Sequence, residues 1–182
     1  MEKLNIEDQT HFHSNTVSQI SGILADHAGL ELETQSIITS AALYHDIGKS
    51  CVPESILNKP AKLTSSEFKI VKTHSYMGYQ FLLRKARVML AAAIVALQHH
   101  EKPDGSGYAG TSNIHPYAKV VAVADVFDAL LSKRPYKKGW SPDEIVGYMQ
   151  EKKDKEFDAT YISALIDSLD DILSLYGDSK SA

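Results

Sequence analysis

Hydrophobic residues recur at helical spacing along most of the chain, and no segment shows a convincing alternation of the kind that predicts a strand. Two helix starts carry capping boxes, one formed by Thr64 with Glu67 and the other by Ser141 with Glu144. The pattern therefore predicts an all-α fold: one domain over residues 1–176, a bundle of roughly seven helices, followed by a flexible tail at residues 177–182. The expected helices cover residues 6–28, 33–46, 64–83, 88–100, 116–132, a segment that opens at Ser141, and 159–176.

Five of these helices carry a histidine or an aspartate on an otherwise apolar stripe. In the first helix, Val17, Ile20 and Leu24 follow His13 on the same face. We therefore expect five helices to aim imidazole and carboxylate groups at a shared interior. The other members are His45 with Ile38 and Ala41, followed by Asp46; His74 with Ile70, Met77 and Phe81; His99 with Val88, Ala92 and Val95, followed by His100; and Asp125 with Val121 and Asp128.

A single histidine on an apolar face is more often a hydrogen-bonded core residue than a metal ligand. The carboxylates are harder to explain in this way, because burying Asp46 or Asp125 without a partner is costly. Few lysines or arginines share the stripes, so metal ions are the better partners for the set. Imidazoles and carboxylates that hold two metal ions close together indicate a metal-dependent phosphohydrolase.

Some reactive residues do not belong to this set. His11, His27 and His115 lie off the stripe, near a helix end or in a loop, and we expect structural or solvated roles for them. Cys51 is expected to be a small packing residue rather than a nucleophile.

Composition narrows the class of protein. A net charge of −4 argues against a broad nucleic-acid surface, and a single cysteine excludes an internal disulfide. No apolar stretch is long enough to cross a bilayer, and the first eight residues lack the apolar core of a signal peptide. The expectation is a cytoplasmic protein that contacts neither a membrane nor a nucleic-acid polymer.

Several motifs in the same order resemble a known family. His45-Asp46 followed by Ile47-Gly48-Lys49 resembles the HD phosphohydrolase motif. The subfamily called HD-GYP has further signatures that this sequence is similar to. They correspond to His99-His100-Glu101 with Asp104-Gly105-Ser106-Gly107-Tyr108, to residues 124–130 with Arg134-Pro135-Tyr136-Lys137, to residues 56–60, and to Phe157-Asp158.

The resemblance implies a helical bundle of the HD-domain type and a bacterial signalling enzyme that hydrolyses cyclic di-GMP or a related cyclic dinucleotide. It implies two divalent metal ions, iron or manganese, that activate a hydroxide for attack on the phosphodiester. Asp46 would bridge them, and the neutral Gln9, where some members have a glutamate, favours two ions over three. One ion would be held by His13, His45, Asp46 and Asp125, and the second by Asp46, His74, His99 and His100.

The resemblance also assigns residues to the substrate. Lys49, Arg134 and Lys137 are expected to hold its phosphates. Without the resemblance, Arg134 and Lys137 would be interpreted as part of a solvated basic patch. Tyr108 is expected at the mouth of the site. Lys49, Asp46 and Asp128 are the expected catalytic residues, with Asp128 orienting a ligand or the attacking water.

The sequence departs from the subfamily pattern at Ala109, which replaces the proline of the GYP motif, in a loop that is shorter than usual. It also has Ala159 where the family often has proline. The altered loop keeps two other functions open: a catalytically silent receptor for a cyclic dinucleotide or a signalling protein at Gly105 to Tyr108, and an HD phosphohydrolase that acts on other nucleotides.

Overall fold

The structure is a computed structural model that describes residues 6–85, 89–132 and 139–177, with side chains described from residue 12 onward. Within these ranges there is no strand, so the predicted all-α fold is confirmed. The expected tail lies outside the described residues apart from Gly177, which ends the last helix. The elements are α1 (Ile6–His27), α2 (Leu32–Ala42), the 3-10 helix η1 (Ile47–Cys51), α3 (Glu54–Leu57), α4 (Ser65–Lys85), α5 (Leu90–Gln98), α6 (Pro116–Leu131), α7 (Pro142–Glu151), α8 (Ala159–Asp167) and α9 (Leu169–Gly177).

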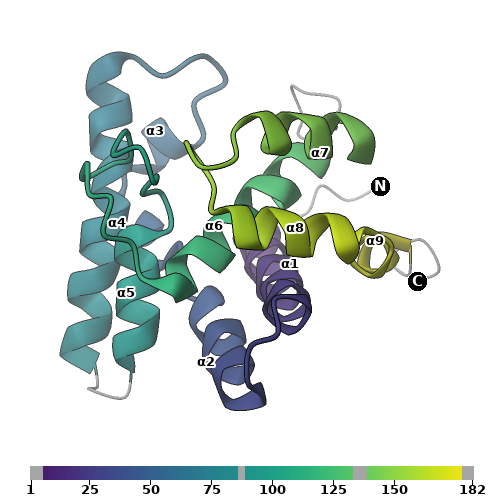
Figure 1. The fold of residues 1–182 in the computed structure, drawn as a ribbon. Coiled ribbons are helices and arrows are strands. Elements are labelled where there is room, and N and C mark those ends of the chain that lie inside the picture. Colours follow the sequence, from purple (N-terminus) through teal and green to yellow (C-terminus); the bar gives the residue numbers. More distant parts are fainter. Residues whose placement is uncertain (1–5, 86–88, 133–138, 178–182) are drawn as a thin grey trace.

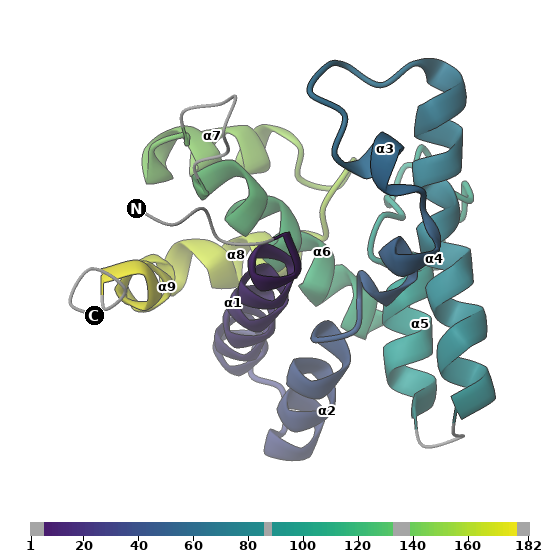
Figure 2. The ribbon, with the colours of Figure 1, turned by 180° about the vertical axis from the view of Figure 1, so that it is seen from behind.

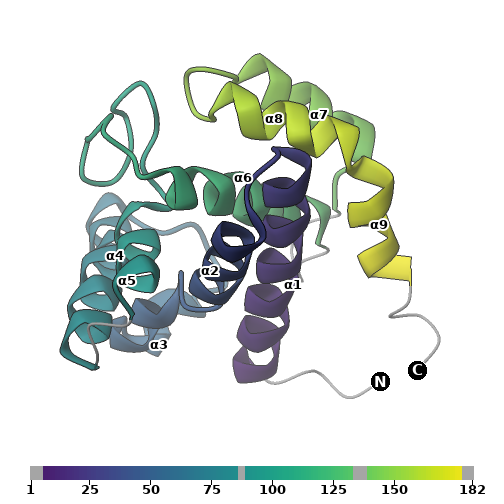
Figure 3. The same cartoon turned by 60° about the horizontal axis from the view of Figure 1, so that its bottom comes forward.

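Helix α6 lies between two groups of helices (Figure 1). The antiparallel pair α4 and α5 lies on one side, and α7, α8 and α9 lie on the other. Seen from behind, α1 and α2 lie at the front of the molecule (Figure 2). Helix α1 packs against α2, α6 and α8. Figure 3 shows that the loop between α5 and α6 extends away from α1.

The central position of α6 follows from its sequence. Its apolar side chains surround the helix axis, and Val120, Val123 and Phe127 are fully buried. Asp125 and Asp128 come from the same helix and are 9% and 2% exposed, so the fold carries two carboxylates into the interior.

Two glycines bring η1 against the backbone of α4. A Cβ atom on Gly48 would lie 1.9 Å from the carbonyl oxygen of His74 and 2.6 Å from the backbone nitrogen of Gly78. No side chain fits there, so only glycine permits this close approach. The contact places the His45-Asp46 segment, which immediately precedes η1, beside His74.

The structure corrects several predicted boundaries. The helix predicted over residues 33–46 ends at Ala42, and His45 and Asp46 lie in the turn that leads into η1. The predicted last helix is two helices, which divide at Ser168. The Ser168 hydroxyl donates to the carbonyl oxygen of Ala164, a local bond that competes with the helical ladder. The short α3 has no counterpart in the prediction.

One predicted apolar stripe is wrong. Ile70, Met77 and Phe81 of α4 are 41%, 42% and 46% exposed, whereas His74 between them is buried. Helix α4 lies at the periphery of the bundle, so its buried face is narrow and is formed by His74, Ser75, Gly78 and Leu82. Among the described helices, none combines the length and apolarity needed to span a bilayer.

Candidate metal centre

Asp46 lies at the centre of a cluster of imidazole rings. Its Oδ1 lies 3.3 Å from Nε2 of His74 and 3.7 Å from Nε2 of His99. Its Oδ2 lies 3.3 Å from Nε2 of His45, and Nζ of Lys49 donates to the same oxygen. One carboxylate therefore faces imidazoles from three segments: the turn before η1, helix α4 and the end of α5.

Backbone carbonyl groups fix the orientation of three of these rings. Nδ1 of His45, His74 and His99 lies 2.7, 2.7 and 3.1 Å from the carbonyl oxygen three residues earlier. A carbonyl oxygen only accepts, so Nδ1 carries the proton in each ring and Nε2 presents its lone pair to the cluster. This is the arrangement in which histidines bind metal ions in proteins.

His13 reaches the cluster from α1 and is oriented differently. Its Nδ1 lies 2.5 Å from Oδ2 of Asp128, and its Nε2 lies 3.1 Å from Oδ1 of Asp125. The same oxygen of Asp125 lies 3.9 Å from Nε2 of His45. Nδ1 of His13 therefore faces the carboxylate of Asp128 on α6, whereas Nδ1 of the other three rings faces a backbone carbonyl oxygen.

Two sets of groups could each hold an ion. In the described part of the chain, one potential ligand atom each from His13, His45 and Asp46 lies within 4.8 Å of the others. The same limit holds for Asp46, His74, His99 and His100. Asp46 is common to both sets, as a bridging carboxylate would be, and Asp125 adjoins the first.

The electrostatics of the cluster favour anionic carboxylates. Burial alone would raise the pKa of Asp46, but the surrounding imidazoles, His45 above all, lower it well below its usual value. The pKa of Asp125 is likewise lowered, against its burial, chiefly by the hydrogen bond with His13. Burial and the neighbouring His99 hold the pKa of His100 well below its usual value. Ionised carboxylates and a neutral imidazole are the protonation states that metal binding requires.

Two buried atoms in the cluster lack hydrogen bonds. Nε2 of His45 and Oδ1 of Asp46 are shielded from solvent, and neither has a hydrogen-bond partner among the described residues. An unsatisfied buried polar atom costs about 1–3 kcal/mol. A cation would satisfy both a lone pair on nitrogen and a carboxylate oxygen, so the residues present fit divalent metal ions.

The loop after His100 is held by a buried glutamate. Glu101 is 3% exposed and accepts hydrogen bonds from the backbone nitrogens of Ala109 at 2.7 Å and Thr111 at 3.0 Å. A proline at position 109 would have no N–H to donate. A Cβ on Gly107 would lie 2.5 Å from Cα of Glu101, so this position also requires glycine. The loop is therefore packed onto Glu101 itself.

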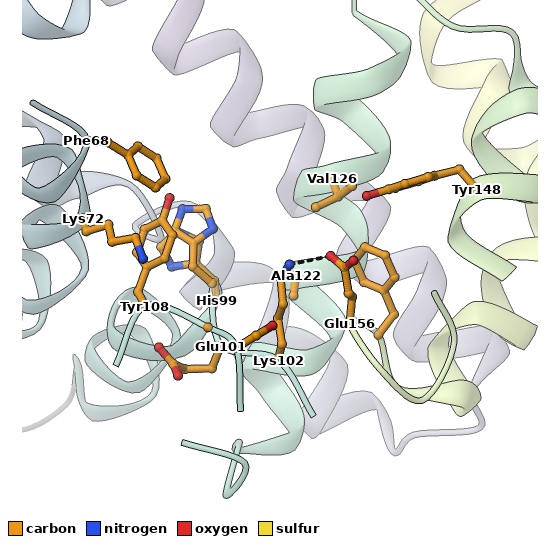
Figure 4. A pocket seen from close by; sticks show the side chains of 14 residues that line it. Phe68, Lys72, His99, Glu101, Lys102, Tyr108, Ala122, Val126, Tyr148 and Glu156 are labelled. Carbon is orange, nitrogen blue, oxygen red and sulfur yellow. Dashed lines mark hydrogen bonds and ion pairs between the residues drawn. The ribbon is translucent and has the colours of Figure 1, made fainter. Parts of the chain in front are cut away.

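The loop forms one side of a cavity of about 350 Å³ beside the cluster. The ring of Tyr108, which lines this cavity, lies 4.4 Å from that of His100, centroid to centroid, at the edge of the His/Asp cluster. Figure 4 shows Phe68, Lys72 and Tyr108 along one wall and Tyr148 and Glu156 on the other. The cavity gives a small ligand access to His99 and His100, which also line it.

The other candidate residues have varied positions. Arg134 and Lys137 lie outside the described residues. Cys51 is exposed, so the expected packing role is wrong. His27 pairs with Asp171 at 3.3 Å, and Nδ1 of His115 accepts from the backbone at the start of α6, so both have structural roles, as expected.

Sequence reasoning missed two residues near the cluster, Tyr176 and Lys72. Tyr176 of α9 donates to Oδ1 of Asp128 at 2.6 Å, across 48 residues of sequence. Lys72 lines the cavity. Neither belongs to a motif used above, although the position of Lys72, two residues before His74, could have drawn attention to it.

Comparison with known proteins adds an independent line of evidence. The cyclic di-GMP phosphodiesterase response regulator RpfG of Xanthomonas campestris is 42% identical over 154 residues, which cover 82% of this chain and 41% of that protein. The 3′3′-cGAMP-specific phosphodiesterase 2 of Vibrio cholerae is 35% identical over 171 residues, which cover 92% of this chain and 33% of the relative. The chain thus spans less than half the length of either curated relative.

A solved structure shares the fold. Bd1817, an HDG"Y"P protein from Bdellovibrio bacteriovorus, superposes with a TM-score of 0.73 over 88% of this chain and 52% of that chain, at 23% identity. At that identity the similarity supports the helical arrangement alone.

The sequence profile of the HD domain family matches residues 3–161, which is most of the chain. Together with the relatives, this match confirms the resemblance drawn from the motifs at His45-Asp46 and His99-His100. The chain belongs to the HD domain family.

Proposed function

We propose that this chain is a metal-dependent phosphodiesterase that hydrolyses a cyclic dinucleotide, with cyclic di-GMP as the first candidate. The observation that carries the proposal is the Asp46 carboxylate, which faces two sets of imidazoles and has an oxygen without a hydrogen bond. The names of two relatives specify cyclic di-GMP and 3′3′-cGAMP, which supports the substrate class.

The donor set suits two divalent transition-metal ions, and we propose iron or manganese. One would be held by His13, His45, Asp46 and Asp125, and the other by Asp46, His74, His99 and His100. Bound there, such ions would lower the pKa of a water molecule and neutralise charge on a phosphoryl oxygen.

The chain's own residues would prepare the site for this chemistry. Asp128 holds His13 so that its Nε2 faces Asp125. Lys49, whose side chain is 37% exposed, places a positive charge beside Asp46 at the edge of the cluster, where it would also hold a phosphate oxygen. Tyr108, next to His100, would contact the substrate. Arg134 and Lys137 remain proposed phosphate ligands.

The experiment is an assay of the metal-loaded protein, purified without oxygen, with cyclic di-GMP and 3′3′-cGAMP, followed by chromatography of the products. We expect a linear dinucleotide or mononucleotides from at least one substrate. Asp125→Asn removes the carboxylate that pairs with His13 and should abolish the reaction. The control His27→Ala removes the His27–Asp171 pair, which lies away from the cluster, and should leave the reaction unchanged.

The same assay separates the alternatives. Tight binding of a cyclic dinucleotide without any product would reject the enzyme and identify a receptor. Turnover of other nucleotides alone would identify a phosphohydrolase of different specificity.

A signalling-protein partner at the loop from Gly105 to Tyr108 is a separate proposal. Ser106 in this loop and Asp104 immediately before it are exposed, whereas the Tyr108 ring contacts His100. A partner would therefore contact these exposed polar side chains, and Asp104→Lys should weaken its binding without changing metal content.

A further inference from the structure

Two lysines line opposite walls of the cavity beside the cluster (Figure 4), and they differ in their partners. Nζ of Lys102 donates to the carboxylate of Glu156. Nζ of Lys72 lies over two aromatic rings, 4.8 Å from the centroid of Tyr108 and 5.3 Å from that of Phe68.

This difference determines which lysine has a positive charge that no carboxylate offsets. The carboxylate of Glu156 neutralises Lys102. An aromatic ring attracts an ammonium group through its quadrupole and carries no net charge, so Tyr108 and Phe68 position Lys72 without neutralising it. No carboxylate in the described ranges forms an ion pair with Lys72. Of the two lysines, Lys72 is therefore the one that offers a free positive charge to an anion in the cavity.

The two rings also limit the movement of the ammonium group. Phe68 and Tyr108 pack edge to face, with centroids 6.0 Å apart, and Lys72 lies one helical turn after Phe68 on α4. A lysine that is already held near its bound position loses less conformational entropy when it binds an anion. The contact with Tyr108 therefore both positions the ammonium group of Lys72 and lowers the entropic cost when that group binds an anion.

Lys72 lies beside the metal-ligand cluster rather than inside it, because the ring of Tyr108 separates them. This ring contacts His100 and His74 on the cluster side, with centroid distances of 4.4 and 6.1 Å. A group bound by Lys72 would therefore be a neighbour of the group held by the cluster.

A cyclic dinucleotide contains two phosphodiester groups, each with one negative charge. If the cluster holds the group that is hydrolysed, the second enters the adjoining space and needs a cationic partner. We propose that Lys72 binds this second phosphate, so that it selects substrates with two phosphodiester groups. The proposal rests on the proposed function and adds a specificity-determining residue to it.

The experiment compares two substrates with the same type of reacting bond. Cyclic di-GMP has two phosphodiester groups, and bis(p-nitrophenyl) phosphate has one. Lys72→Met keeps most of the side-chain length and removes the charge, Lys72→Arg retains the charge, and Lys69→Met removes an exposed lysine from the same helix as a matched control. Metal content and helical circular dichroism are measured for every variant.

We expect Lys72→Met to raise KM for cyclic di-GMP about tenfold, the effect of losing one charge-assisted contact. Its KM for bis(p-nitrophenyl) phosphate should stay within about twofold of the wild type, because that substrate has no second phosphodiester to lose. Lys72→Arg should restore KM for cyclic di-GMP, and Lys69→Met should change neither substrate. Equal effects on both substrates, or no effect on either, would overturn the proposal.

The proposed function has a separate outcome. If the wild-type protein binds cyclic di-GMP without hydrolysing it, the proposed function fails. The role of Lys72 is then tested by the dissociation constant for cyclic di-GMP, which Lys72→Met should raise about tenfold. If the wild-type protein neither hydrolyses nor binds cyclic di-GMP or 3′3′-cGAMP, both proposals are rejected.

Discussion

The hydroxyl group of Tyr176 donates to Oδ1 of Asp128 over 2.6 Å, while the other oxygen of Asp128 lies 2.5 Å from Nδ1 of His13. Burial, together with Asp128, raises the pKa of Tyr176, so the phenol stays protonated and remains the donor. This chain of contacts joins the last helix, α9, to a candidate metal ligand on the first. The C-terminal helix is thus part of the support of the site as well as of the core.

Tyr176→Phe should weaken metal binding without unfolding the protein. Losing the hydrogen bond leaves Asp128 with less restraint, so His13 is oriented less precisely. Mutating such supporting groups typically lowers metal affinity about 10–100-fold, and we expect the lower end because Tyr176 acts through Asp128. Competition with a chromophoric chelator measures the affinity. Tyr161→Phe, in neighbouring α8, is the control, and equal affinities in the two variants would contradict the prediction.

His99→Ala should lose metal and activity while the helical content is retained. The residue follows the last turn of α5, and its Nε2 faces Asp46, so the substitution removes a ligand without breaking a helix. Elemental analysis measures the metal, and far-ultraviolet circular dichroism measures the helical content. Full activity in this variant would show that His99 is not a ligand.

Gly107→Ala should destabilise the loop after His100. The added Cβ would lie 2.5 Å from Cα of Glu101 and 2.8 Å from a carbonyl oxygen, so the backbone must shift, at a cost of about 1–3 kcal/mol. Tyr108 would move with it, and KM for a cyclic dinucleotide should rise. Gly147→Ala is a suitable control because a Cβ there meets no atom within 4 Å. In helix α7 that change should stabilise the protein by up to about 1 kcal/mol. Thermal unfolding of both variants tests the contrast.

The metal-free protein should lose stability as the pH rises above neutrality. Burial would lower the pKa of His13, but hydrogen bonds and charge from Asp125 and Asp128 raise it from 6.5 to about 9. A raised pKa means that the folded state binds the proton more tightly, so this contribution is complete below pH 6.5 and is lost as the pH rises through about 9. Urea titrations of the metal-free protein across this range measure it. His13→Asn should show a smaller decline, and identical slopes would refute the assignment.

The sequence predicted most of the helices from local spacing, and the same spacing predicted that several histidines and aspartates face inward. Their grouping into two ligand sets came from the resemblance to the HD-GYP subfamily. The stripe of His13, Val17, Ile20 and Leu24 holds in α1, where those three apolar side chains are fully buried. The same reasoning failed for α4, because the side of a helix that faces solvent is decided by its neighbours and not by its own spacing.

Other features depended on contacts between distant segments. The end of α2 before His45 reflects the turn that fits η1 against the backbone of α4, and no local signal marks it. The partnership of Tyr176 with Asp128 and the position of Lys72 over Tyr108 join residues that are far apart in sequence. Spacing along one helix contains no information about such pairs.

The number of metal ions bound by Asp46→Asn and Asp125→Asn tests the central claim most directly. If Asp46 bridges two ions, the wild-type protein purified without oxygen should hold about two per chain. Asp46→Asn should then lose both ions, whereas Asp125→Asn, which alters only the His13 side, should keep one. Two ions retained by Asp46→Asn, or a wild-type protein that hydrolyses cyclic dinucleotides without bound metal, would contradict the account.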